Sequence, residues 1–165
     1  MSDLTAPDDA AHIIGYGDHL PAAPSDRDRR HTVLVYSDDP ATRDRVRLAV
    51  GRRPAPDLGR VEWLECATGP EVLAAVDKGG IDLAVLDGEA GPTGGMGLAK
   101  QFKDELADSP MTLLLIGRRD DAWLAVWSLA DAVVAHPLDP PALSAAVADL
   151  LRRRESALPV RRAVG

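Results

Sequence analysis

Three short polar segments carry the side chains that could do chemistry in this chain of 165 residues. Two are acidic, Ser37-Asp38-Asp39 and Asp87-Gly88-Glu89, and the third places His136 before a proline. Carboxylates that lie close together repel one another unless a cation or a proton intervenes. The residue types therefore indicate either a divalent metal site or an acidic pocket in which one carboxyl keeps its proton.

These segments must be positioned by regular elements, and the apolar pattern between them predicts which. Five runs of about five residues, rich in Val, Leu and Ile, are typical of strands buried on both faces. A helix-like stretch follows each run, often behind a capping residue such as Asp39 or Thr68. Five successive βα units predict a parallel sheet with helices on both faces. The predicted strands are 32–36, 61–66, 82–86, 112–116 and 132–135.

All three polar segments come directly after predicted strands. Since the carboxyl ends of parallel strands lie at one edge of the sheet, we expect the segments to lie together there. The composition adds exclusions. Cys66 is the only cysteine, which excludes an internal disulfide and a cysteine-rich zinc site. No apolar run approaches the roughly 20 residues that cross a bilayer, and a net charge of −7 argues against the whole surface binding nucleic acid.

The two ends of the chain differ in composition from its centre. We expect an extended acidic arm at 1–30, rich in Pro, Ala and Asp, a folded domain at 31–154 and a basic tail at 155–165. One apolar patch of the arm is a candidate for docking to a partner protein, and it consists of Ile13, Ile14, Tyr16 and Leu20.

Three stretches resemble the receiver domain of two-component response regulators, in their order and roughly in their spacing. They read VLVYSDDPATRDRV at 33–46, DLAVLDGEAGPTGGMGLAK at 82–100 and AHPLDPPAL at 135–143. This resemblance implies an α/β fold of the flavodoxin-like type, a doubly wound (βα)5 sandwich around a five-stranded parallel sheet.

The resemblance also implies roles for single residues. Asp87 falls on the position that accepts a phosphoryl group from a histidine kinase, and Asp38 falls on one of the two acids that hold Mg²⁺. Glu89 could supply a further oxygen to the metal. The expected Mg²⁺ ligands are therefore Asp38, Asp87 and Glu89, although the function we expect requires no cofactor.

Four positions depart from the pattern of the family. Ser37 replaces the other metal-binding acid, Ile116 the hydroxyl residue, His136 the lysine and Val133 the aromatic switch residue. A hydrogen bond to a charged group stabilises by roughly 1.5–3 kcal/mol. Losing the hydroxyl and the ammonium therefore removes a large part of the ~5.5 kcal/mol that a full two-state switch needs. We expect a degenerate receiver that is not an enzyme.

Several stretches, among them GGIDLAVLDGEAGPTGGMGLAKQFKDELA, resemble more closely the orphan response-regulator-like proteins of mycobacteria and other actinobacteria. These are encoded beside the operon for respiratory complex I. The resemblance implies an accessory subunit on the peripheral part of that complex, at the cytoplasmic side of the inner membrane. The alternative is a stand-alone response regulator that a histidine kinase phosphorylates on Asp87. A hydrolase, a nucleotide-binding enzyme and a DNA-binding regulator find less support in the motifs.

The remaining chemistry-bearing residues have ordinary interpretations. Trp123 and Trp127 share a face of the fourth predicted helix, where core packing and partner binding are both open. Cys66 is expected to be a small core residue. The histidines of the first part of the chain lack metal-ligand spacing and are expected in solvent: His12, His19 and His31.

Overall fold

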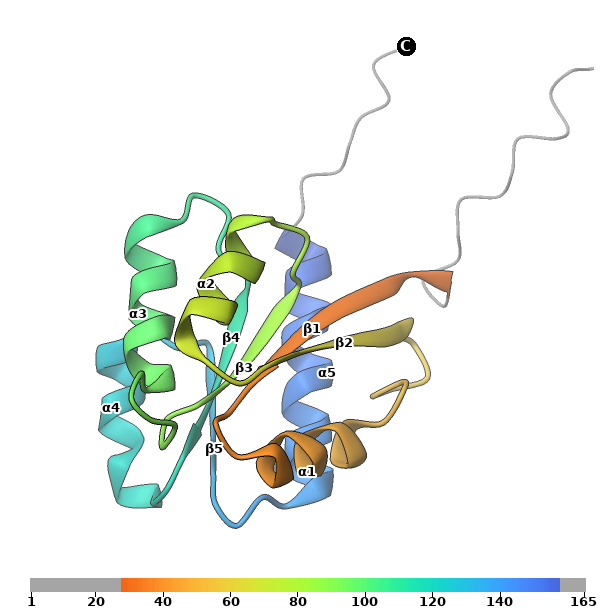
Figure 1. Cartoon of the computed structure of the whole chain (residues 1–165). Helices are drawn as coiled ribbons and strands as arrows, with labels where there is room; N and C mark the ends of the chain where they lie inside the picture. Colours follow the sequence, from red (N-terminus) through yellow and green to blue (C-terminus); the bar gives the residue numbers. More distant parts are fainter. Residues whose placement is uncertain (1–27, 158–165) are drawn as a thin grey trace, which may run out of the picture.

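The computed structural model describes residues 28–157, which form one parallel sheet between two layers of helices (Figure 1). The strand order is β2-β1-β3-β4-β5, so the order reverses between β1 and β3. This confirms the predicted doubly wound α/β fold. The strands are β1 (Arg30–Tyr36), β2 (Arg60–Cys66), β3 (Leu83–Asp87), β4 (Met111–Ile116) and β5 (Ala132–Ala135).

The two helical layers bury opposite faces of the sheet, because successive side chains of a strand point to opposite sides. One core cluster joins Val33 and Val35 of β1 to Leu143 and Val147, and the other joins Leu34 of β1 to the opposite layer. The helices α1 and α5 cover the first face, and α2, α3 and α4 cover the second (Figure 1). Their bounds are α1 (Pro40–Val50), α2 (Gly69–Asp77), α3 (Gly95–Glu105), α4 (Ala122–Ser128) and α5 (Pro140–Ala157).

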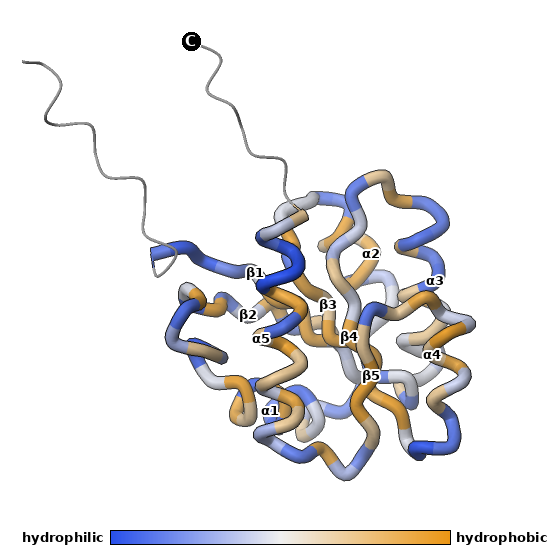
Figure 2. Tube along the Cα trace, turned by 180° about the vertical axis from the view of Figure 1, so that it is seen from behind, coloured by the Kyte–Doolittle hydropathy of each residue, from blue (hydrophilic) through white to orange (hydrophobic). Residues whose placement is uncertain are grey.

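The hydropathy of the residues differs between the central strands and the beginning of β1 (Figure 2). The central strands β3 and β4 are hydrophobic, and every residue of β3 is buried. The beginning of β1 is hydrophilic, and its first residue Arg30 is exposed. The sequence pattern was therefore sufficient for the centre of the sheet, where both faces must be apolar.

Element bounds differ from the predicted ones in a few places. Asp87 is the last residue of β3 rather than the first residue of a loop, and Asp82 lies outside that strand. The helix α5 continues to Ala157, three residues past the predicted end of the domain. Such shifts of one to three residues are ordinary at element ends, where no apolar pattern marks the boundary.

The prediction that His31 lies in solvent is wrong. Its side chain is 3% exposed, and its Nε2 lies 3.2 Å from Oε1 of Glu155 near the end of α5. Arg29 approaches the same carboxylate, with its Nη1 at 3.9 Å. The beginning of β1 therefore packs against the end of α5, although the two are separated by more than a hundred residues of sequence.

Candidate functional site

The reversal of strand order places the two acidic segments next to each other. Tyr36 pairs with Leu86 in the parallel ladder of β1 and β3. The residues that follow Tyr36 therefore reach the same edge of the sheet as Asp87, the last residue of β3. This confirms that the two acidic segments, which follow β1 and β3, meet at one edge of the sheet, as expected for a doubly wound sheet.

Asp87 is buried, and both of its carboxylate oxygens accept hydrogen bonds. Ser37 is fully buried, and its Oγ donates to Oδ2 of Asp87 at 2.7 Å. The backbone N–H of Glu89 donates to Oδ1 at 2.9 Å. The hydroxyl of Ser37 thus stands beside the central carboxylate as a hydrogen-bond donor, where a second acid would have added a negative charge.

The other two acids of the first segment have different surroundings. Asp38 is exposed, and its Oδ2 accepts a hydrogen bond from the backbone N–H of Gly91 at 3.2 Å. Asp39 caps α1, because its Oδ1 accepts from the backbone N–H of Ala41 at 2.9 Å and its Oδ2 from Oγ1 of Thr42 at 3.0 Å. These hydrogen bonds lower the pKa of Asp39. Asp39 is therefore a structural residue, and Asp38 faces the loop after β3.

Tyr36 holds the loop after β3 through a hydrogen bond. Its side chain is fully buried and its hydroxyl donates to the carbonyl oxygen of Thr93 at 2.6 Å. Burial raises the pKa of Tyr36, and the charges of Asp38 and Asp87 raise it further. The spacing of side chains in the sequence does not predict this role. The one signal for it was an aromatic residue in a strand whose other core residues are aliphatic.

A close backbone contact also holds the loop after β3. A Cβ atom on Gly95 would lie 2.7 Å from the carbonyl oxygen of Asp87, so this position requires glycine. The peptide bond between Gly91 and Pro92 is cis. The loop after β3 therefore packs on that strand. Its backbone N–H groups at Glu89 and Gly91 donate to the carboxylates of Asp87 and Asp38, so these two groups are not open to a phosphate.

Arg43 of α1 brings a positive charge to this edge of the sheet, and nothing in the sequence pattern predicts this. Its Nη1 donates to the carbonyl oxygen of Ser37 at 2.6 Å, and its Nε lies 3.4 Å from Oε1 of Glu65. The guanidinium group is thereby committed to a backbone carbonyl and to a carboxylate of β2. It fixes the turn that carries Ser37 and Asp38.

The structure places the degenerate switch positions at the ends of β4 and β5. Ile116 is buried at the end of β4, and its carbonyl oxygen accepts a hydrogen bond from the backbone N–H of His136 at 2.8 Å. The His136–Pro137 peptide bond is cis, and the His136 side chain is half-buried. Val133 is half-buried on β5 and packs against the core. The side chains of Ile116 and Val133 are apolar and offer no hydrogen bond at this site.

Mg²⁺ ligation at this edge of the sheet stays a prediction. Within residues 28–157, no three His, Cys, Asp or Glu side chains come together as a metal site. Asp38 and Asp87 lie at the same edge, on both sides of the loop after β3, and their predicted role as Mg²⁺ ligands with Glu89 is untested. The Glu89 side chain turns toward Gly117, where an added Cβ would lie 2.8 Å from its Oε1. Both oxygens of Asp87 already accept hydrogen bonds.

A second feature lies on α4, away from the acidic pocket. Trp123 is 65% exposed and Trp127 is 53% exposed, so neither is a core residue. Val126 and Leu129 beside them are exposed as well, at 78% and 51%. We call these four residues the α4 patch. The sequence showed that the tryptophans share a face, but not that this face points away from the sheet.

The neighbouring side chains leave the α4 patch open. The Nζ of Lys100 on α3 lies 6.0 Å from the centre of the Trp127 ring, at the outer limit of a cation–π contact. Ala125 and Ser128 form the buried side of the same helix. The expected docking residues of the arm, Ile13, Ile14, Tyr16 and Leu20, lie outside the described residues.

Cys66 has the predicted structural role. Its side chain is 3% exposed within the second core cluster, and burial together with the charge of Glu71 raises its pKa to about 11. A thiol with such a pKa is almost entirely protonated at neutral pH. Cys66 therefore takes no part in the chemistry of the site.

Comparison with solved structures confirms the fold. A receiver domain protein of Clostridium thermocellum covers 78% of this chain and 99% of its own, with a TM-score of 0.64 and 19% identity. A CheY-like receiver domain protein of Methanospirillum hungatei covers 78% and 98%, with a TM-score of 0.61 and 21% identity. These likenesses show the fold alone.

Comparison of sequences goes further, although no family model matches the chain. Response regulatory proteins from two strains of Mycobacterium tuberculosis, both described as uncharacterized, are each 59% identical over 120 residues. The matched segment covers 73% of this chain and 90% of each relative. With the strand order, the acidic strand ends and this identity together, the chain belongs to the response-regulator family and carries its CheY-like receiver domain.

Proposed function

We propose that the protein acts by binding another protein rather than by catalysis, as an accessory subunit on the peripheral part of respiratory complex I. The observation that carries the binding function is the α4 patch, where two tryptophans are each more than half exposed. Tryptophans at the centre of protein interfaces typically contribute about 2 kcal/mol or more each to binding. The choice of complex I rests on the resemblance to the orphan response-regulator-like proteins encoded beside its operon.

The acidic pocket supports a non-catalytic role. Ser37 donates to Asp87 from the position of an acid, so the central carboxylate is satisfied without a cation. Ile116 and Val133 provide no hydrogen-bond donor or acceptor from their side chains. A phosphoryl group on Asp87 would therefore find few partners that could convert it into a conformational change.

The proposed location is the cytoplasmic side of the inner membrane, reached through the complex. No helix formed by residues 28–157 is long and apolar enough to span a bilayer. Attachment at the membrane would thus come from contacts such as the α4 patch. Residues of the arm, which the structure does not describe, are a second candidate contact.

Purification of complex I from native membranes tests this proposal. A tag on a complex I subunit recovers the complex, and mass spectrometry scores this chain in the eluate. We expect wild type at near-stoichiometric amounts. The double variant Trp123→Ala/Trp127→Ala should bind roughly 10³-fold more weakly, because it loses about 4 kcal/mol of contact energy.

Leu48→Ala is the matched control, since Leu48 is 83% exposed on α1, on the opposite helical layer. It should co-purify like wild type. Absence of the wild-type chain from complex I would refute the partner. Equal recovery of wild type and the tryptophan variant would refute the α4 patch as the contact.

The family itself favours a second candidate function, a stand-alone response regulator in a two-component system with a histidine kinase as its partner. Asp87 lies at the carboxyl end of β3, at the reversal of strand order. Incubation with acetyl phosphate and Mg²⁺, followed by intact-mass measurement, separates the two functions. An adduct on wild type that is absent from Asp87→Asn supports phosphorylation, whereas an unmodified wild-type chain excludes it.

A further inference from the structure

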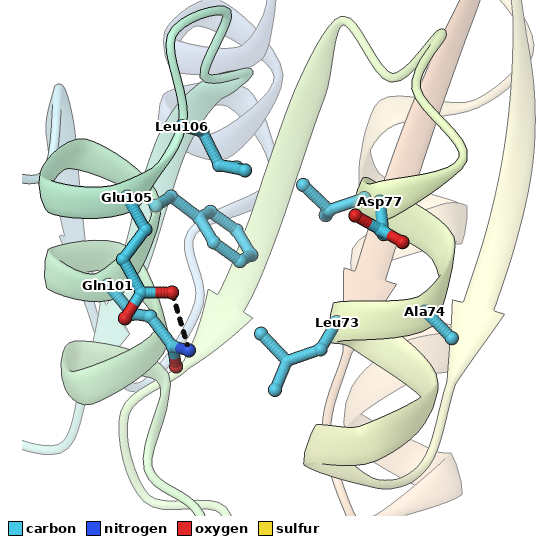
Figure 3. Close-up of a pocket in the computed structure, with 8 residues that line it drawn as sticks. Leu73, Ala74, Asp77, Gln101, Glu105 and Leu106 are labelled. Carbon is cyan, nitrogen blue, oxygen red and sulfur yellow. Dashed lines mark hydrogen bonds between the residues drawn. The ribbon is translucent and has the colours of Figure 1, made fainter.

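A groove of about 340 Å³ runs between α2 and α3, on the helical layer that also carries α4 (Figure 3). Its floor is apolar and includes Val76 and Phe102, both buried. Leu73 projects into it from α2 and is 38% exposed. The groove therefore offers apolar surface to a small aliphatic side chain.

The rim of the groove is acidic. Asp77 at the end of α2 and Glu105 at the end of α3 lie on opposite sides of it (Figure 3). Gln101 donates to Oε2 of Glu105 at 3.1 Å, which leaves the carboxylate charge uncompensated. The lysines of α3 are committed elsewhere, since Lys100 pairs with Asp104 and Lys103 with Asp131. An occupant that joins small apolar side chains to positive charge fits this groove.

The last turns of α5 come close to the same end of α3. Nη1 of Arg154 lies 2.9 Å from Oδ1 of Asp108 and donates to the carbonyl oxygen of Ser109 at 3.3 Å. The guanidinium group of Arg154 lowers the pKa of Asp108. Asp108 follows the groove residue Leu106 by two positions. The side chain of Arg154 thus joins α5 to the loop that follows α3, next to the end of the groove.

We propose that residues 158–165, Leu-Pro-Val-Arg-Arg-Ala-Val-Gly, bind in the groove between α2 and α3. Eight extended residues reach about 27 Å, and they begin just after the turn of α5 whose Arg154 contacts the loop that follows α3. Valine side chains of the segment pack on Leu73, above the buried Phe102 ring, and Arg161 and Arg162 meet the acidic rim. The groove is separate from the α4 patch, so this inference does not depend on the proposed function.

The charges of the two ends of the chain favour residues 158–165 over residues 1–27 as the occupant of the groove. The segment 158–165 contains two arginines and no acid, whereas 1–27 contains five aspartates and one arginine. Like charges at a contact are destabilising, so the acidic rim repels the first segment and attracts the last. The last segment is also the one that follows the Arg154 contact directly.

NMR on the full-length protein tests the proposal, because Phe102 is the only phenylalanine and its ring gives a unique signal. We expect nuclear Overhauser effects between this ring, or the Leu73 methyls, and the methyls of Val160 or Val164. Reversing two exposed ion pairs with Arg161→Glu/Arg162→Glu should reduce the docking equilibrium roughly 2- to 30-fold.

Reversing the charges of the groove as well gives a second test. Adding Asp77→Lys/Glu105→Lys to Arg161→Glu/Arg162→Glu should restore the nuclear Overhauser effects, since the ion pairs then form with reversed sign. Arg45→Glu/Arg119→Glu changes the net charge equally at exposed sites elsewhere and should leave them unchanged. Absence of any contact between 158–165 and the groove in wild type would overturn the proposal. Contacts that appear only as protein concentration rises would also overturn it, because the segment would then come from a second copy.

Discussion

Ser37 is the residue that most changes how the acidic pocket works. It donates a hydrogen bond to a carboxylate that is 5% exposed, and it does so from the position where the family carries a second acid. The sequence predicted this departure, because the order of motifs was enough to align the position. Tyr36 and Arg43 were not predicted, since each donates to a backbone carbonyl oxygen, and such a bond leaves no trace in side-chain spacing.

Removing the hydroxyl should destabilise the fold at neutral pH. Ser37→Ala leaves Oδ2 of buried Asp87 without its 2.7 Å donor, and a hydrogen bond to a charged group contributes about 1.5–3 kcal/mol. We expect a loss of that size in the free energy of unfolding, measured by urea denaturation. In an Asp87→Ala background the same substitution should cost much less. Equal costs in the two backgrounds would show that the pair is not coupled.

Individual helices differ in how far their sequence determined them. Thr68 was predicted to cap α2, and its Oγ1 accepts from the backbone N–H of Glu71 at 3.3 Å, which confirms the cap. For α4 the spacing of Trp123 and Trp127 was clear but the direction of their shared face was not. The helix is only seven residues long, and its small residues Ala125 and Ser128 form the buried side. Small buried residues carry too weak an apolar signal to orient such a helix.

The cap of α2 is testable at this scale. Glu71 reinforces it, because its Oε2 accepts from the backbone N–H of Ala67 at 2.9 Å. Thr68→Ala should lower the free energy of unfolding by about 1 kcal/mol, the usual cost of a lost N-cap. Thr68→Ser retains the hydroxyl and should remain within a few tenths of a kcal/mol of wild type. If serine and alanine proved equally destabilising, the loss would come from packing of the threonine methyl group instead.

For the whole molecule, the apolar pattern was sufficient to predict strand number and layers, but not the contacts that join the ends of the fold. Long-range polar contacts such as His31 with Glu155 and Arg152 with Asp57 depend on the finished topology. Arg152 Nε donates to Oδ2 of Asp57 at 2.7 Å, and its Nη2 donates to Oδ1 at 2.8 Å. This two-point contact joins α5 to the segment between α1 and β2.

That contact predicts a pH dependence of stability. The Arg152 hydrogen bonds lower the pKa of Asp57 to about 2 from an ordinary value of 3.8. A lowered pKa stabilises the fold above pH 4, and the contribution disappears as pH falls toward 2. The stability difference between wild type and Asp57→Asn should therefore shrink over this range, and less salt should enlarge it at pH 6. Asp120→Asn is the control, and a difference that persisted at pH 2 would contradict this account.

The two edges of the sheet are protected in different ways. Charged side chains guard β2, where Glu62 and Glu65 form ion pairs with neighbouring arginines. The strand β5 reads Ala-Val-Val-Ala and carries no charged side chain, so its shortness, four residues, is the protective feature that the strand itself provides. It lies beside the α4 helix, whose tryptophans are exposed. We therefore expect copies of the chain to associate first along this edge as protein concentration rises, because a short edge strand and exposed tryptophans lie side by side there.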